Sequence, residues 1–114
     1  MNMKVAVIGS RGLTVDDLGR YLPQDVTEIV SGGARGINTC AKEYAQTHGI
    51  PLTEFLPQYD KYPGRIAPLR RNDTIIAYAD VVLAFWDGVS RGTKYVIDRC
   101  EKEGVPCRVF LAQK

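Results

Sequence analysis

Three short glycine-containing segments of this 114-residue chain combine amide, hydroxyl and guanidinium groups in a pattern suited to holding an anion. Each segment follows an apolar run and precedes a helical pattern. A helix N-terminus carries unpaired N–H groups and partial positive charge, and glycine lets the backbone approach a ligand closely. The candidate phosphate-binding residues are Gly9, Ser10, Arg11, Ser31, Gly32, Gly33, Ala34, Arg35, Gly36, Asp87, Gly88, Ser90, Gly92 and Thr93.

A fourth segment, "PLRRND" at residues 68–73, adds positive charge. Proline is favoured at the first position of a helix, so Pro68 places Arg70, Arg71 and Asn72 near another helix N-terminus. These three residues join the candidate site. A solvated basic start to a surface helix is the alternative interpretation.

The elements that must position these segments follow from the alternation of short apolar runs with helical patterns. The pattern predicts strands at 4–9, 26–30, 51–55, 81–85 and 107–111, and helices at 14–22, 36–48, 68–78 and 92–103. Such alternation is typical of a parallel sheet covered by helices on both faces. In the first helix, Thr14 is expected to be the N-cap, with Leu13 and Leu18 packing together across the cap.

The composition of the strands predicts their order in the sheet. The runs "VAVI" and "VVLAF" are apolar throughout, as expected of central strands, whereas "LTEF" and "CRVFL" have polar interruptions that suit edges. Right-handed crossovers then favour a Rossmann-like α/β three-layer sandwich with a five-stranded parallel sheet in the order 3-2-1-4-5. All strand-to-helix turns emerge at one edge of such a sheet, so we expect the glycine segments to converge there.

Length and composition indicate an ordinary globular protein. We expect a single domain, 1–114, with 45% hydrophobic and 25% charged residues and a net charge of +2, which is too small to attract nucleic acid in bulk. The three cysteines form no CxxC pair, so we predict no metal site and a reducing compartment. No apolar run is long enough to span a membrane, and the N-terminus is typical of a strand rather than a signal peptide. These features predict a cytoplasmic protein without a cofactor.

The blocks "VIGSRG", "VSGGARGIN", "APLRRND" and "AFWDGVSRGT" resemble the signature blocks of the SLOG superfamily, in particular its small YspA/cpYpsA-related branch. The blocks occur in the expected order and cover nearly the whole chain. The superfamily includes the Lonely Guy phosphoribohydrolases and the DNA-processing protein A. The resemblance implies a Rossmann-like fold that binds a nucleotide or nucleotide-derived ligand at the glycine segments, and a homodimer.

Two departures from the related sequences bear on activity. The glutamate that assists N-glycosidic cleavage in the phosphoribohydrolases corresponds to Val96, which cannot hold a proton. Arg71 matches their arginine, but its acidic partner is missing. Related sequences also have GID where this chain has Gly36-Ile37-Asn38, so Asn38 keeps hydrogen-bonding capacity without the charge. Whether the chain is an enzyme is left open, with a binding role favoured.

Three functions follow as hypotheses. The leading one is the binding or sensing of a nucleotide-derived phosphorylated small molecule. The second is a phosphoribohydrolase-like hydrolase in which Asp87, with Arg71, replaces the missing acid; Asp87 is equally suited to cap its turn. The third, and least favoured, is single-stranded DNA binding. Tyr59 and Tyr62 are candidates either for stacking on a base or for anchoring their loop, and Trp86 is expected to pack rather than stack.

Overall fold

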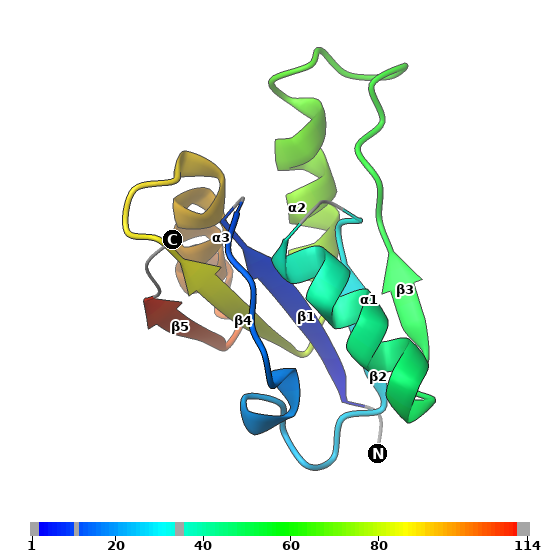
Figure 1. Ribbon diagram of the computed structural model, residues 1–114. Helices are drawn as coiled ribbons and strands as arrows, with labels where there is room; N and C mark the ends of the chain where they lie inside the picture. Colours follow the sequence, from blue (N-terminus) through cyan, green and yellow to red (C-terminus); the bar gives the residue numbers. More distant parts are fainter. Residues whose placement is uncertain (1–2, 11, 34–35, 112–114) are drawn as a thin grey trace.

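The computed structural model describes residues 3–10, 12–33 and 36–111. Five strands form one parallel sheet in the order β3-β2-β1-β4-β5 (Figure 1), which confirms the predicted order. The strands are β1 (Lys4–Gly9), β2 (Glu28–Ser31), β3 (Leu52–Glu54), β4 (Val81–Trp86) and β5 (Cys107–Leu111). The helices are the 3-10 helix η1 (Leu18–Arg20) and the α-helices α1 (Ile37–His48), α2 (Ala67–Tyr78) and α3 (Arg91–Glu103).

The central strands are the buried ones, as their composition predicts. The interior residues of β1 and nearly all of β4 are buried, whereas β3 and β5 are partly exposed along their length. β1 and β4 pair in register from Val5 with Val81 to Gly9 with Phe85. Their carboxyl ends therefore lie side by side at one edge of the sheet, where the connections to the following elements begin.

Helices cover the sheet on both faces, in three layers (Figure 1). On one face, Val5, Val7, Ile29 and Leu83 pack with buried residues of α1 and of the segment around η1. On the other face, residues from the same strands pack against α2 and α3, including Ile75 on α2. Successive residues of a strand point to opposite faces, so apolar runs without polar interruption supply both cores.

The predicted helix at 14–22 is wrong in extent, since only η1 forms in that segment. Thr14 is exposed and does not cap it; the residue before η1 is Asp17, and its side chain forms no capping hydrogen bond. Gly19 lowers the helix propensity of the segment at 14–22. A segment this short also cannot offset the free-energy cost of helix nucleation. A Cβ at Gly19 would lie 2.7 Å from the Tyr44 hydroxyl, so a larger residue there would displace the Tyr44 side chain on α1. Leu13 is nevertheless buried, as predicted.

The helices of the described residues are short. The α-helices contain 12 or 13 residues. None of the helices found in residues 3–10, 12–33 and 36–111 combines the length and apolar character that crossing a membrane requires.

Candidate functional site

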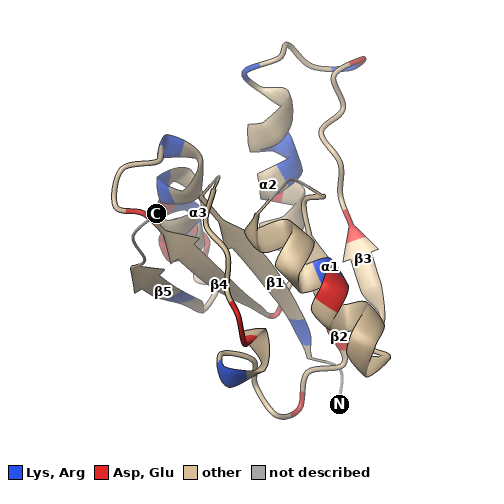
Figure 2. Ribbon diagram, in the orientation of Figure 1, with Lys and Arg blue, Asp and Glu red and all other residues tan. Residues whose placement is uncertain are grey.

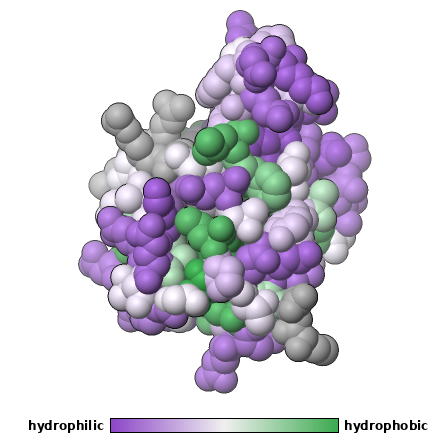
Figure 3. Space-filling model, turned by 90° about the vertical axis from the view of Figure 1, so that its right-hand side faces the viewer, coloured by the Kyte–Doolittle hydropathy of each residue, from purple (hydrophilic) through white to green (hydrophobic). Residues whose placement is uncertain are grey.

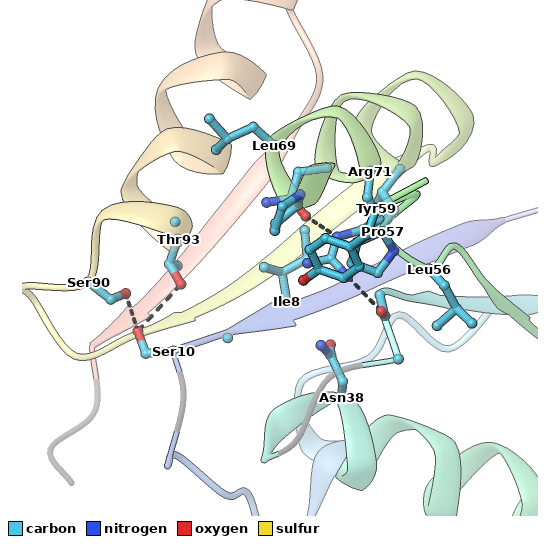
Figure 4. A pocket seen from close by; sticks show the side chains of 17 residues that line it. Ile8, Ser10, Asn38, Leu56, Pro57, Tyr59, Leu69, Arg71, Ser90 and Thr93 are labelled. Atoms are coloured by element: carbon cyan, nitrogen blue, oxygen red, sulfur yellow. Dashed lines mark hydrogen bonds between the residues drawn. The ribbon is translucent and has the colours of Figure 1, made fainter. Parts of the chain in front are cut away.

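A cavity of about 600 Å³ opens at the carboxyl edge of the sheet, where β1, β2 and β4 end (Figure 4). It is lined by residues from the turns after these strands, from the β3–α2 loop and from the first turns of the helices. A ligand in the crevice at this edge is typical of open parallel α/β sheets. The lining residues are Ile8, Gly9, Ser10, Gly32, Gly33, Asn38, Leu56, Pro57, Tyr59, Pro68, Leu69, Arg71, Asn72, Ile75, Ser90, Gly92 and Thr93.

A cluster of three hydroxyl groups lies at one end of the cavity (Figure 4). The Ser10 Oγ is 2.7 Å from the Ser90 Oγ and 3.4 Å from the Thr93 Oγ1, and it accepts a hydrogen bond from the Asp87 N–H. A hydroxyl has a single proton, so Ser10 can donate to only one of its two neighbours. The cluster therefore keeps at least one hydroxyl proton that a ligand oxygen can accept.

The N-terminus of α3 borders the hydroxyl cluster. The Asp87 Oδ1 accepts hydrogen bonds from the N–H groups of Val89 (2.9 Å) and Ser90 (2.8 Å), which holds the turn that leads into the helix. Ser90 is the N-cap residue, but its side chain does not cap the helix, because its hydroxyl faces Ser10 instead. The Ser90 side chain thus leaves the first-turn N–H groups of α3 uncapped, and they present partial positive charge beside Gly92.

Arg71 supplies a half-buried positive charge to the cavity. Its Nη1 donates to the Gly32 carbonyl at 2.6 Å and its Nε donates to the Asn72 Oδ1 at 2.7 Å. Arg71 takes part in none of the ion pairs between described residues. Burial lowers the pKa of Arg71 below its usual value, while the nearby Tyr59 acts in the opposite direction. A guanidinium stays protonated in proteins, so this charge is retained without a carboxylate partner.

The backbone at Gly32 lies close to the Arg71 guanidinium, which explains why glycine occupies that position. A Cβ at Gly32 would lie 2.8 Å from the Arg71 Cζ, so a larger residue would displace the guanidinium. Two buried amide side chains, Asn38 on α1 and Asn72 on α2, also line the cavity, and each is 8% exposed. The polar part of the site is therefore assembled from α1, α2, α3 and the turns between them.

The other end of the cavity is apolar and aromatic (Figure 4). Leu56, Pro57 and Tyr59 come from the β3–α2 loop. Leu69, from the first turn of α2, also lines the cavity but lies nearer to α3 in Figure 4. Tyr59 was a candidate from the sequence, whereas Leu56, Pro57 and Leu69 were not. The topology indicates the loop residues Leu56 and Pro57, because the loop after the third strand must leave the sheet at the same edge as the glycine turns.

The structure brings together most of the predicted site residues that it describes. Gly9, Ser10, Gly32, Gly33, Arg71, Asn72, Ser90, Gly92 and Thr93 line the cavity. Ser31, Gly36, Arg70, Asp87 and Gly88 do not belong to its lining. Arg11, Ala34 and Arg35 lie outside the described residues.

Arg70 lines a second cavity, of about 520 Å³, which shares Leu56 and Arg71 with the first. There Arg70 and Arg99 approach Asp73, at 3.5 Å and 3.8 Å, and Tyr62 contributes to the wall. Of the two arginines predicted for one site, Arg70 thus does not line the first cavity, and Arg71 does. Successive helical residues point about 100° apart, which separates the side chains of Arg70 and Arg71.

Of the two residues considered for catalysis, Arg71 lines the cavity and Asp87 does not. Val96 is fully buried against the sheet, and Asp87 holds its turn through Oδ1. Trp86 donates from Nε1 to the Ser90 carbonyl at 3.0 Å, so it packs on the turn as predicted. Among the described lining residues there is no aspartate, glutamate or histidine.

The three cysteines are free thiols. Cys100 is buried and Cys107 is half-buried; the hydrogen bond between them raises the pKa of Cys100 and lowers that of Cys107. Within residues 3–10, 12–33 and 36–111, no three histidine, cysteine, aspartate or glutamate side chains come together in a way that would hold a metal ion.

Comparison with known proteins shows a similarity to a phage protein. The chain is 36% identical to the Gene 61 protein of Mycobacterium phage D29 over 83 residues, which cover 68% of this chain. The aligned region spans 66% of the length of that phage protein, whose name specifies neither a ligand nor a reaction. No family model matches the chain. No solved structure matches it either.

Proposed function

We propose that the protein binds a nucleotide or nucleotide-derived phosphorylated ligand in the cavity at the carboxyl edge of the sheet. The observation that carries the proposal is Arg71, a half-buried guanidinium in the cavity wall that has no ion-pair partner among the described residues. A buried charge without a counter-charge is costly, and an anionic ligand would remove that cost.

The rest of the lining supports a ligand larger than a phosphate ion. The Ser10, Ser90 and Thr93 hydroxyls and the uncapped start of α3 supply donors for phosphate oxygens. A volume of about 600 Å³ lies in the range of pockets that enclose a whole small molecule. Assignment to the SLOG superfamily, on the signature blocks quoted above, is part of the same proposal.

Binding is favoured over the two alternatives by the charges of the described residues. Cleavage of an N-glycosidic bond calls for an acid or base near the reacting atoms, and the described lining offers no carboxylate. Single-stranded DNA binding calls for a basic groove that follows the backbone. In Figure 2, basic residues are instead distributed over several elements and interspersed with acidic ones. Homodimer formation and cytoplasmic location stay predictions.

The test is calorimetric titration of the protein with adenosine 5′-monophosphate, ribose 5-phosphate, ADP-ribose and adenosine. We expect roughly micromolar binding of the phosphorylated compounds, at least about tenfold tighter than that of adenosine. Arg71→Ala should weaken binding by about 10- to 100-fold, because a hydrogen bond to a charged group contributes about 1.5–3 kcal/mol.

Arg70→Ala is the matched control, since it removes the same charge from the neighbouring position on α2. It should change the affinity by less than about threefold, a long-range electrostatic effect that salt screens. Equal losses in Arg70→Ala and Arg71→Ala, or no binding of any phosphorylated compound below millimolar concentration, would contradict the proposed function.

A further inference from the structure

Tyr59, on the β3–α2 loop, has features of a ligand-contacting residue, and the role argued for it rests on the proposed function. Two of the exposed large hydrophobic or aromatic side chains, Leu56 (63% exposed) and Tyr59 (61% exposed), line the same cavity. Figure 3, which views the molecule from the side of β3, shows hydrophobic patches surrounded by hydrophilic surface. Exposed apolar groups that gather at a cavity are typical of a surface that a ligand covers.

The contacts of the other tyrosines argue against a purely structural role for Tyr59. Tyr78 and Tyr95 donate their hydroxyl protons to Glu28 and Asp73, and Tyr21 and Tyr44 pack against other rings. Within the described part of the chain, Tyr59 has no ring–ring contact and its hydroxyl forms no hydrogen bond. Its loop is therefore not anchored through this side chain, which leaves the ring available to a ligand.

The polar and apolar ends of the cavity indicate how a ligand is oriented in it. Figure 4 shows the Ser10, Ser90 and Thr93 hydroxyls at one end and Tyr59, Pro57 and Leu56 toward the other. The donor-rich end suits a phosphoryl group, and the aromatic and apolar end suits a flat ring that stacks by its face. Tyr59 lies close enough to Arg71 to act electrostatically on it, in the direction that raises the pKa of Arg71. Arg71 is half-buried in the same wall.

We propose that Tyr59, with Leu56 and Pro57 beside it, is the surface against which the ligand's heterocyclic base stacks, while the phosphoryl group lies between Arg71 and the hydroxyl cluster. Tyr59 is thus a specificity-determining residue that separates nucleotides from phosphorylated sugars. Stacking is tolerant of base identity, since every base has an aromatic face, so the four ribonucleoside monophosphates should bind with similar affinity.

The experiment measures the affinities of adenosine 5′-monophosphate and ribose 5-phosphate for wild type and three variants. Tyr59→Ala should weaken binding of the nucleotide by about 5- to 100-fold, the range for loss of one base–aromatic stack, and leave ribose 5-phosphate within twofold. Tyr59→Phe should bind both as wild type does. Tyr62→Ala, which alters the second cavity, is the matched control and should also bind both as wild type does.

The outcomes separate this inference from the proposed function. If both ligands bind and Arg71→Ala weakens both, but Tyr59→Ala leaves the nucleotide affinity unchanged, the stacking role is wrong and the proposed function stands. An equal loss for the two ligands in Tyr59→Ala also overturns the stacking role, because it indicates general damage to the cavity. If neither ligand binds wild type, both proposals fail together.

Discussion

Two neighbouring arginines of α2 line the two cavities beside it, Arg71 both of them and Arg70 only the second, and the charges of these two side chains are arranged differently. Arg70 has a 59% exposed side chain and shares Asp73 with Arg99. Arg71 is half-buried and donates to neutral oxygens of Gly32 and Asn72. The number of arginines therefore does not distinguish the cavities. What distinguishes the two arginines is that Arg70 shares a carboxylate with Arg99 in the second cavity, whereas Arg71, which lines both cavities, has no ion-pair partner among the described residues.

The walls of the two cavities also differ in packing. In the first cavity, glycines allow β1 and the turn after β2 to contact large side chains at a distance that a Cβ would prevent. The wall of the second contains charged side chains that are partly exposed to solvent. Substitutions in the first cavity should consequently affect stability and ligand affinity differently from substitutions in the second.

The largest effect is expected for Gly9→Ala in the first cavity. The added Cβ would lie 2.6 Å from the Cβ of Ile37, which is 1% exposed and cannot move without disturbing the core. Overpacking of this kind should lower the free energy of unfolding by about 3 kcal/mol. Urea denaturation monitored by circular dichroism measures the change.

Gly64→Ala is the control for this prediction, because it adds the same atom in the loop that leads to α2. Its Cβ would meet nothing within 4 Å, so the free energy of unfolding should change by less than about 0.5 kcal/mol. Similar stabilities for Gly9→Ala and Gly64→Ala would show that the first cavity is no more tightly packed than the loop.

A smaller effect, and one of opposite sign on stability, is expected for Gly92→Ala at the start of α3. The added Cβ meets no protein atom within 4 Å, and alanine in place of glycine should stabilise the helix by about 0.5–1 kcal/mol. Because Gly92 lines the cavity, the methyl group should also hinder the approach of the ligand to the backbone and weaken adenosine 5′-monophosphate binding about tenfold. Thermal unfolding and calorimetry measure the two changes.

Arg91→Ala is the matched control, since Arg91 is the exposed neighbour of Gly92 and does not line the cavity. It should leave the affinity within about threefold of wild type, as expected of a solvent-screened charge. A Gly92→Ala protein that is stabilised and yet binds the nucleotide as wild type does would remove α3 from the binding surface.

The smallest effect on stability is expected for Asp73→Asn in the second cavity. Exposed ion pairs contribute little, so the free energy of unfolding at pH 7 should fall by at most about 1 kcal/mol, with the nucleotide affinity unchanged. The hydrogen bond to Asp73 raises the pKa of Tyr95. A raised pKa in the folded state means that protonated Tyr95 stabilises the fold below about pH 10, and that this contribution is lost as the pH rises through the folded-state value.

Asp73→Asn should therefore lower the pKa of Tyr95 and reduce the loss of stability above pH 10. Tyrosinate absorbance during an alkaline titration, followed in parallel with thermal unfolding, measures both. Tyr78 provides the internal control, because its pKa is raised by the hydrogen bond to Glu28, which the substitution does not touch. An unchanged Tyr95 titration would mean that Asp73 does not hold this hydroxyl in solution.

Much of the fold could be predicted from local patterns. The uninterrupted apolar runs identified β1 and β4 as central strands, and strand–helix alternation with right-handed crossovers predicted the order of the sheet. The segment at 14–22 was the exception. Its apolar residues are spaced like those of a helix, but Gly19 and the packing of Leu13 and Leu18 favour an irregular segment closed by a single 3-10 turn.

The candidate site was only partly predictable. Parallel topology brings strand-to-helix turns to one edge, so Ser10, Gly32 and Ser90 could be grouped from the sequence. The loop residues Leu56 and Pro57 were missed because no local pattern marks them, and their place in the wall depends on the path of a long connection.

The sequence by itself determined which strands are buried, where the turns emerge and that these turns carry donors for an anion, because such features depend on residue type and on a period of two or 3.6. Only the tertiary structure decided which of two adjacent arginines faces the cavity and which is paired with a carboxylate. That choice depends on the rotation of α2 against the sheet and on the neighbours that α3 and the turn after β2 bring to each side. Side chains one residue apart point in different directions, so a difference of about 100° around one helix separates a compensated charge from an uncompensated one.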